Sequence, residues 1–148
     1  MKILISSDST CDLSAALREK YNIAIVPLYI EKEGRNYRDG VDIVPQDIFD
    51  YVGSGRGVCR TAAVNTEEYR ERFTAWRESY DAVIHFNISS EMSSCYQNAC
   101  AAAAECDNVY VVDSRNLSTG SGLLVLEAAE RAAAGESPED IVRQMRET

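Results

Sequence analysis

The side chains with the clearest chemical potential are Ser93 and Ser94, which lie at the start of an alanine-rich stretch over residues 94–106. Alanine is the best helix former, so this stretch is predicted to be a helix. The first turn of a helix leaves backbone N–H groups without partners and carries a partial positive charge. Hydroxyl groups placed there could help to hold a carboxylate or a phosphate without any Lys or Arg. Plain helix capping is the alternative, because Ser94 and Gln97 match a capping box.

Thr61, Asp8 and Cys95 are further candidates for chemistry. Thr61 lies in an expected loop before a helix, where its hydroxyl could converge on the same face as Ser93. Asp8 follows an expected strand, as in phosphatases with an aspartyl nucleophile, but Thr10 stands where those enzymes need a second acid. Cys95 falls in the first turn of the alanine-rich helix, where the helix dipole could activate its thiol. The alternative for each cysteine is a small buried apolar residue.

His85 is the only histidine of the chain and lies within an expected strand. It is therefore predicted to be a packed residue, and no Ser-His-Asp set is expected. The five cysteines include no C-x-x-C pair, which argues against a zinc site. Residues 53–57 contain G-x-G-x-G, but this run follows an expected helix, whereas a dinucleotide fingerprint follows a strand. The sequence thus shows no evident base, metal cluster or phosphate loop, and we expect neither a cofactor nor a metal.

An alternation of strands and helices must position these side chains. Short apolar or β-branched runs predict strands, at residues 2–6, 23–30, 82–88 and 109–112. Helical periodicity and propensity predict helices, at residues 13–21, 45–52, 94–106 and 120–134, with two more that begin near 66 and 137. Such alternation indicates an α/β fold: a three-layer, Rossmann-like αβα arrangement with a mostly parallel sheet. We expect one domain over residues 1–148.

Particular residues predict where some elements begin. Asp12 and Thr66 are expected to cap two of the helices, and Pro45 suits the first position of another. Residues 137–140 resemble a capping box. The polar segment 31–39 contains a glycine suited to a turn, which fits a small hairpin or another excursion of the chain.

The carboxyl ends of the predicted strands carry many polar side chains, in residues 6–10, 89–94 and 113–119. In open parallel sheets, ligands bind beyond this edge. The helix that begins near residue 66 has aromatic residues at helical spacing, which are expected to pack in the core: Tyr69, Phe73, Trp76 and Tyr80. We therefore expect a ligand site at the carboxyl edge of the sheet, and not on this aromatic face.

The composition suits a globular protein of 148 residues, since 45% are hydrophobic, 26% are charged and the formal net charge is −9. This acidity argues against nucleic acid, whose phosphates need Lys and Arg, and against a membrane surface. No apolar run reaches the roughly 18 residues needed for membrane insertion. The odd number of cysteines and the lack of an export signal favour reduced thiols and a cytoplasmic location.

Read in order, the motifs resemble those of the bacterial DegV family. Residues 5–13 resemble its opening D-S-x-x-D-L segment, and residues 88–99 resemble its I-S-S-x-L-S-G-T-Y-Q-x-A signature. Residues 61–65 lie where the family has a T-S-x-P-S loop, and residues 112–122 match its V-D-S-x-x-x-S-x-G-x-G stretch. The resemblance covers nearly the whole chain. The departures from the family pattern include Ala62, Val64, Ser94 and Cys95.

The resemblance implies a protein that binds a long-chain fatty acid and catalyses no reaction. By position, Thr61 and Ser93 match the family's carboxyl-binding residues. The acyl chain would lie in an apolar tunnel, and a separate fatty-acid kinase subunit would convert the bound acid to acyl phosphate. The family has a second α/β domain that covers the tunnel and that we expect to be absent here. This chain alone is therefore expected to expose an apolar face and to retain fatty acid weakly.

Two other functions stay open at this point. The chain could be a phosphoryl or acyl transferase that uses Asp8 or Cys95, in which case turnover of a generic ester or phosphate would depend on Asp8. It could also be a protein-interaction module that docks a kinase subunit without lipid. A fatty acid released when the protein is denatured would distinguish the carrier from both.

Overall fold

The computed structural model describes residues 2–8, 14–27, 29–32, 35–38, 45–55, 60–62, 64–87, 95–113 and 119–147. The strands are β1 (Ile3–Asp8), β2 (Ala24–Val26), β3 (Tyr29–Lys32), β4 (Arg35–Arg38), β5 (Arg60–Ala62), β6 (Ala82–Asn87) and β7 (Val109–Asp113). The helices are α1 (Ala15–Tyr21), α2 (Pro45–Gly53), α3 (Thr66–Arg77), α4 (Cys95–Ala103), α5 (Thr119–Ala133) and α6 (Pro138–Glu147). Strands and helices thus alternate through much of the chain.

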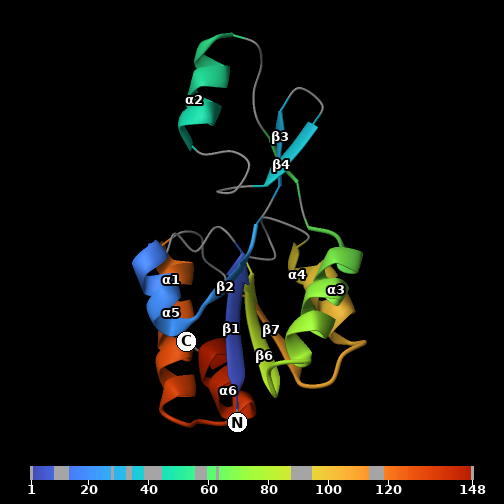
Figure 1. Cartoon of the computed structure of the whole chain (residues 1–148), viewed down its shortest axis with the longest axis vertical. Coiled ribbons are helices and arrows are strands. Elements are labelled where there is room, and N and C mark those ends of the chain that lie inside the picture. Colours follow the sequence, from blue (N-terminus) through green and yellow to red (C-terminus); the bar gives the residue numbers. More distant parts are fainter. Residues whose placement is uncertain are drawn as a thin grey trace.

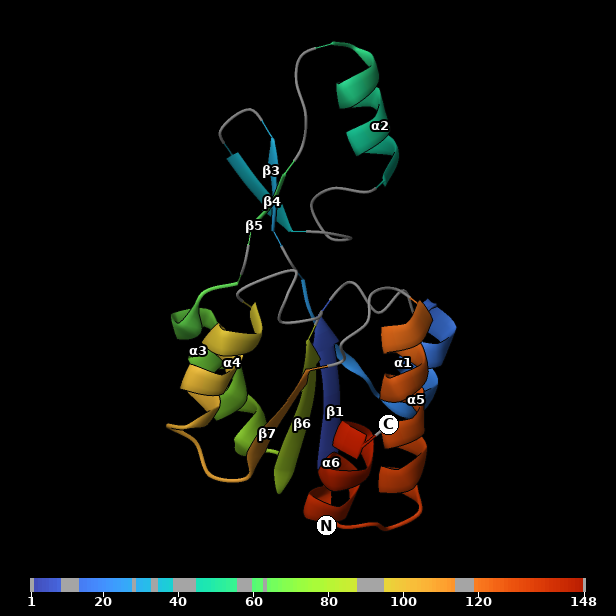
Figure 2. The same cartoon turned by 180° about the vertical axis from the view of Figure 1, so that it is seen from behind.

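A parallel sheet in the order β2-β1-β6-β7 forms the centre of the molecule. Helices α3 and α4 cover one face of this large sheet, and α1, α5 and α6 lie on the other side (Figure 1, Figure 2). The predicted α/β fold, with three layers and a mostly parallel sheet, is therefore confirmed. The strands predicted at 2–6, 82–88 and 109–112 correspond to β1, β6 and β7.

The hydrophobic core consists of two clusters, one on each face of the large sheet. Successive residues of a strand point to opposite faces, so Leu4 joins the cluster on the side of α3 and α4, whereas Ile5 joins the one on the side of α5 and α6. Tyr69 and Phe73 of α3 are fully buried in the first cluster, which confirms that they pack in the core. Ile141 of α6 is equally buried in the second. Apolar packing thus holds the strands from both sides and leaves polar residues at their ends.

The single strand predicted at residues 23–30 is wrong, because the chain changes sheets at Pro27. β2 pairs with β1 in the large sheet, whereas β3, which begins at Tyr29, pairs with β4 and β5 in a small antiparallel sheet. Proline has no backbone N–H to donate to a neighbouring strand, so a continuous strand through this position is disfavoured. The antiparallel pairing of β3 with β4 shows a hairpin, one of the two arrangements that fit residues 31–39.

Thr61 lies in strand β5, and not in the loop that the sequence suggests. The antiparallel register places Thr61 opposite Ile30 and Arg60 opposite Glu31. Three residues are too few to show a strand's alternation, so β5 leaves no pattern of its own. It forms because β3 offers a partner, which makes β3 the central strand of the small sheet.

The small sheet and α2 stand beyond the carboxyl ends of the large sheet (Figure 1). The ammonium nitrogen of Lys32 lies 5.1 Å from the ring centre of Tyr37 and 5.5 Å from that of Tyr51, so this cation joins β3, β4 and α2. The hydroxyl of Tyr29 in β3 donates a hydrogen bond to Glu68 of α3. The small sheet is thereby tied to the helices that cover one face of the large sheet.

The predicted caps of two helices are wrong by a short distance. Asp12 lies outside the described residues, and α1 is capped by Ser14. Asn65, and not Thr66, caps α3. Each cap accepts a hydrogen bond from the N–H three residues further on, and Ser and Asn serve this purpose as well as Asp or Thr does. Pro45 begins α2 as predicted. Among the described residues, no helix is both long enough and apolar enough to cross a membrane.

Candidate ligand-binding site at the carboxyl edge of the large sheet

Three strands of the large sheet end in polar residues at one edge: β1 in Asp8, β6 in Asn87 and β7 in Asp113. The register pairs Asn87 with Asp113, and Ser7 with Phe86, so Asp8 and Asn87 lie next to each other on adjacent strands. Asp8 and Asn87 are fully buried. Because burial of polar groups is costly unless they are satisfied, buried polar side chains at a strand end need an explanation. This edge is therefore the candidate site.

His85 lies in β6, two residues before the strand ends, and is fully buried. Its Nδ1 atom is 2.7 Å from the hydroxyl oxygen of Ser6, and the ring packs edge-on against Tyr69 and Phe73, with centroid distances of 5.4 and 5.6 Å. Burial, aided by the positive charge of Arg72, lowers the pKa of His85 to about 3. The imidazole is therefore neutral at physiological pH, and the prediction of a packed histidine is confirmed.

Tyr69 of α3 lies at the centre of the buried polar residues. Its hydroxyl accepts a hydrogen bond from Nδ2 of Asn87 at 3.1 Å. Burial is the largest cause that raises the pKa of Tyr69 far above its usual value, followed by Cys95 and, more weakly, by Asp8. The phenol thus stays protonated, and it joins α3 to the last residue of β6.

Asp8 and Cys95, the two candidate nucleophiles, are both fully buried. A nucleophile must be reached by its substrate and activated by a base. His85 is the only histidine of the chain, and its Nδ1 is already engaged with Ser6. This arrangement argues against a transferase that uses either side chain. In the described ranges, no group of three or more His, Cys, Asp or Glu side chains could hold a metal ion.

The side chains of Thr61 and Ser93 lie outside what the structure describes, which places only the backbone of Thr61, in β5. Among the described residues, Nδ2 of Asn98 in α4 donates a hydrogen bond to the carbonyl oxygen of Val64 at 2.8 Å. An extended residue spans at most about 3.6 Å, so the Cα atoms of Thr61 and Val64 lie within about 11 Å of each other. The chain that follows β5 is therefore held against helix α4.

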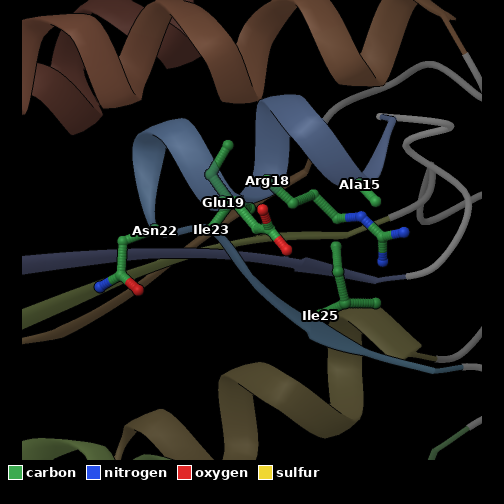
Figure 3. A pocket seen from close by; sticks show the side chains of 6 residues that line it. All are labelled: Ala15, Arg18, Glu19, Asn22, Ile23 and Ile25. Carbon is green, nitrogen blue, oxygen red and sulfur yellow. The ribbon is translucent and has the colours of Figure 1, made fainter.

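Two open cavities lie outside this group of buried polar residues. One, of about 370 Å³, lies between α1 and the edge strand β2 (Figure 3) and is lined by Ala15, Arg18, Glu19, Asn22, Ile23 and Ile25. Nε of Arg18 is buried without a hydrogen-bond partner among the described residues. The other, of about 400 Å³, lies between β7 and α6 and is lined by Tyr110, Glu139, Val142, Arg143 and Arg146. Charged side chains contribute to the lining of both, at Arg18 and Glu19 in the first and at Glu139, Arg143 and Arg146 in the second.

Tyr69 and Asn87 are the site residues that sequence reasoning missed. Helical spacing identifies Tyr69 as a core aromatic, which is correct for its ring, but the spacing says nothing about the hydroxyl. Asn87 could have been found, because it is a polar residue at the carboxyl end of a predicted strand, and the same signal identifies Asp8.

A parallel α/β sheet with polar side chains at its carboxyl edge defines a class of proteins that bind ligands at that edge. The family model described as "Uncharacterised protein, DegV family" matches residues 2–148. The chain therefore belongs to the DegV family. It is 36% identical to a DegV domain-containing protein of Clostridium perfringens and 38% identical to one of Caldanaerobacter subterraneus, over 99% of this chain and 53% of each relative. The chain thus spans about half the length of the curated relatives it matches.

Solved structures of DegV proteins have the same fold. A DegV family protein from Thermus thermophilus matches with a TM-score of 0.92 at 34% identity, and DegV from Bacillus subtilis with 0.91 at 29% identity, each over 99% of this chain and 53% of the other. A protein from Eubacterium ventriosum matches with 0.84 at 29% identity, over 95% of this chain and 51% of the other. The first two are described as fatty acid binding, and the third as binding stearic acid. The chain is thus similar to bacterial proteins that bind fatty acids.

Proposed function

We propose that this chain is a non-catalytic carrier of a long-chain fatty acid, whose carboxyl group is held by the hydroxyls of Thr61 and Ser93. Residues 1–148 act as a lipid-binding domain in the cytoplasm. The observation that carries the proposal is the hydrogen bond from Asn98 to Val64, because it holds α4 against the chain that follows β5. This contact supports a shared ligand for the two hydroxyls, in a family whose solved members are described as fatty acid binding.

The start of α4 supplies further donors for a carboxylate. This helix is nine residues long and begins at Cys95, two positions after Ser93. Its first backbone N–H groups have no partners within the helix, and the helix dipole places partial positive charge there. The neighbouring side chains of Tyr69 and Asn87 are uncharged, since burial raises the pKa of Tyr69. Hydroxyl and amide donors, and not a Lys or Arg of the described part, are therefore expected to hold the head group.

The acyl chain supplies most of the binding energy. About 14 methylene groups, at about 0.8 kcal/mol each, give roughly 11 kcal/mol of gross transfer free energy. Ordering the chain and fixing the complex subtract much of this amount. The hydroxyl contacts therefore decide the orientation of the fatty acid more than its affinity, and they hold the carboxyl group at the mouth of the site.

A separate fatty-acid kinase subunit is the expected partner. The two candidate nucleophiles, Asp8 and Cys95, are buried, and the imidazole of His85 is neutral and packed. A protein with these properties can present a carboxyl group but has no evident means to activate it. Conversion of the presented acid to acyl phosphate would therefore take place on the kinase, after the carboxyl group meets its active site.

The proposal is tested by detecting bound lipid and by comparing one double variant with a matched control double variant. Mass spectrometry of the denatured natural protein should release a fatty acid, and Thr61→Ala combined with Ser93→Ala should abolish its carboxyl-dependent binding while the fold stays intact. The control combines Thr74→Ala with Ser79→Ala, since both of these residues are exposed, and should leave binding unchanged. Equal binding by the wild type and the Thr61/Ser93 double variant would count against this site, and binding of a kinase subunit without any lipid would favour an interaction module.

A further inference from the structure

We propose that the cavity of about 400 Å³ between β7 and α6 binds a small organic oxyanion, which is a carboxylate or a phosphate ester with a flat apolar body. The cavity lies on the face of the large sheet opposite to α4, so this site is independent of the function proposed above. Its volume falls in the range of about 300–1,000 Å³ that is usual for small-molecule sites. The structure describes every residue that lines it: Tyr110, Glu139, Val142, Arg143 and Arg146.

Arg146 supplies a cation that no carboxylate of the described residues neutralises. Its Nη2 atom donates a hydrogen bond to the main-chain carbonyl oxygen of Val111 at 3.1 Å, and the side chain makes no ion pair within the described part of the chain. A carbonyl oxygen accepts a hydrogen bond but carries no net charge, and a guanidinium group has several other N–H donors. The bond therefore fixes Arg146 against the edge strand β7, and it leaves the charge and most of the donors to a ligand.

Arg143 adds a second guanidinium group on the same face of α6, because residues three apart are neighbours on a helix surface. Arg143 pairs with Asp140 at 3.0 Å, but the two side chains are 64% and 50% exposed. An exposed ion pair of this kind contributes little to stability, so Arg143 can turn to a bound anion at small cost. The planar fork of a guanidinium group matches the oxygens of a carboxylate or a phosphate, and two such groups therefore favour an oxyanion.

The apolar body of the ligand would lie against Val142 and the ring of Tyr110. Val142 is buried together with Ile141 in the core cluster beneath the large sheet, so α6 is firmly seated. Tyr110 packs against the same cluster, and its hydroxyl donates a hydrogen bond to Glu139 at 2.9 Å, which ties the ring of β7 to the first turn of α6. Both walls of the cavity are thus held in place, and a ligand has little to order when it binds.

The charge of its lining distinguishes this cavity from the one between α1 and β2. Two Arg and one Glu line the cavity between β7 and α6, whereas one Arg and one Glu, Arg18 and Glu19, line the other. The lining is therefore net positive in a chain whose formal net charge is −9. A local positive charge on an acidic molecule concentrates anions at that place.

NMR titration of the isotope-labelled natural protein with phenyl phosphate and with benzoate tests the site. At least one of these acids should shift the signals of Tyr110, Val142 and Arg143, and the acid that binds more tightly identifies the oxyanion as phosphate or carboxylate. Benzyl alcohol has the same ring and no charge, and it should bind about tenfold more weakly than that acid, because it cannot pair with either Arg. Shifts confined to other residues, or equal binding of benzyl alcohol, would overturn the proposal.

Charge-removing variants assign the binding to the two Arg side chains. Arg143→Gln combined with Arg146→Gln should weaken binding of the tighter acid by about tenfold, the sum expected for two exposed ion pairs. The matched control is Arg18→Gln, which removes the charge from the other cavity and should keep the wild-type affinity. If the double variant folds poorly, Arg143→Gln alone leaves the bond from Arg146 to Val111 intact and should weaken binding by about threefold. Wild-type affinity in the folded variants would show that these Arg side chains hold no anion.

Discussion

Asn98→Ala tests the contact between α4 and the chain that follows β5. The amide of Asn98 donates to the carbonyl oxygen of Val64 at 2.8 Å, in a partly buried position. Loss of a hydrogen bond that leaves its partner poorly satisfied costs about 1–3 kcal/mol. Alanine has the higher helix propensity, which returns about 0.6 kcal/mol inside α4. The free energy of unfolding should therefore fall by about 0.5–2 kcal/mol.

Thermal unfolding followed by circular dichroism checks this magnitude. For a chain of about 150 residues, 1 kcal/mol shifts Tm by roughly 2–4 °C, so a decrease of about 2–6 °C is expected for Asn98→Ala. Asn36→Ala is the matched control, because Asn36 is exposed in β4 and its side chain should contribute little to stability. Carboxyl-dependent binding of fatty acid should also be weaker in Asn98→Ala. A variant with wild-type Tm and wild-type carboxyl-dependent binding would refute both expectations.

Three further predictions follow from the described contacts. Ile141→Ala removes a fully buried side chain beneath the large sheet, so the free energy of unfolding in urea should fall by about 2–5 kcal/mol; a loss below about 1 kcal/mol would contradict the packing of α6. The pKa of His85 is about 3 in the folded protein and about 6.5 in the unfolded chain, so between these pH values only the unfolded chain binds a proton on this ring. The contribution of His85 to the free energy of unfolding should therefore be constant above about pH 7. Below about pH 6.5 the free energy of unfolding should fall by up to about 1.4 kcal/mol per pH unit. The NMR signals of His85 should accordingly show no protonation above pH 5, and a midpoint near pH 6.5 would disprove its burial as a neutral ring. Tyr29→Phe removes the hydrogen bond to Glu68 that ties the small sheet to α3, so limited proteolysis within residues 29–62 should become faster, while an unchanged rate would show that this tie is unimportant.

The large sheet could be predicted because its elements are encoded locally. The apolar runs of β1, β6 and β7 are separated by helical segments, and such alternation permits few topologies. The helix starts were less certain, because Ser14 and Asn65 compete with Asp12 and Thr66 as caps, and all four side chains can accept the same kind of hydrogen bond. The surrounding structure decides which of two nearby side chains accepts the capping hydrogen bond, and so where the helix begins.

The small sheet depends on pairings that the local sequence does not contain. Pro27 interrupts an apolar run that reads as one strand, and β5 forms only because β3 lies beside it. Contacts between segments about thirty residues apart, such as Thr61 with Ile30, leave no periodicity within either segment. The strand that carries Thr61 was therefore the part of the candidate site hardest to recognise.

The candidate site was predictable in its location but not in its internal contacts. Polar residues at strand ends indicated the carboxyl edge, and Asp8 was found in this way. The hydroxyl of Tyr69 was not, because an aromatic residue at helical spacing is explained by its ring alone. The roles of Thr61 and Ser93 came from the resemblance to the DegV family and stay predictions.

The most direct test of the central claim is a crystal structure of the natural protein with palmitic acid bound. Oγ1 of Thr61 and Oγ of Ser93 should both lie within about 2.5–3.0 Å of the oxygens of one carboxyl group, at the start of α4. A carboxyl group bound elsewhere, or two hydroxyls that face away from each other, would contradict the claim.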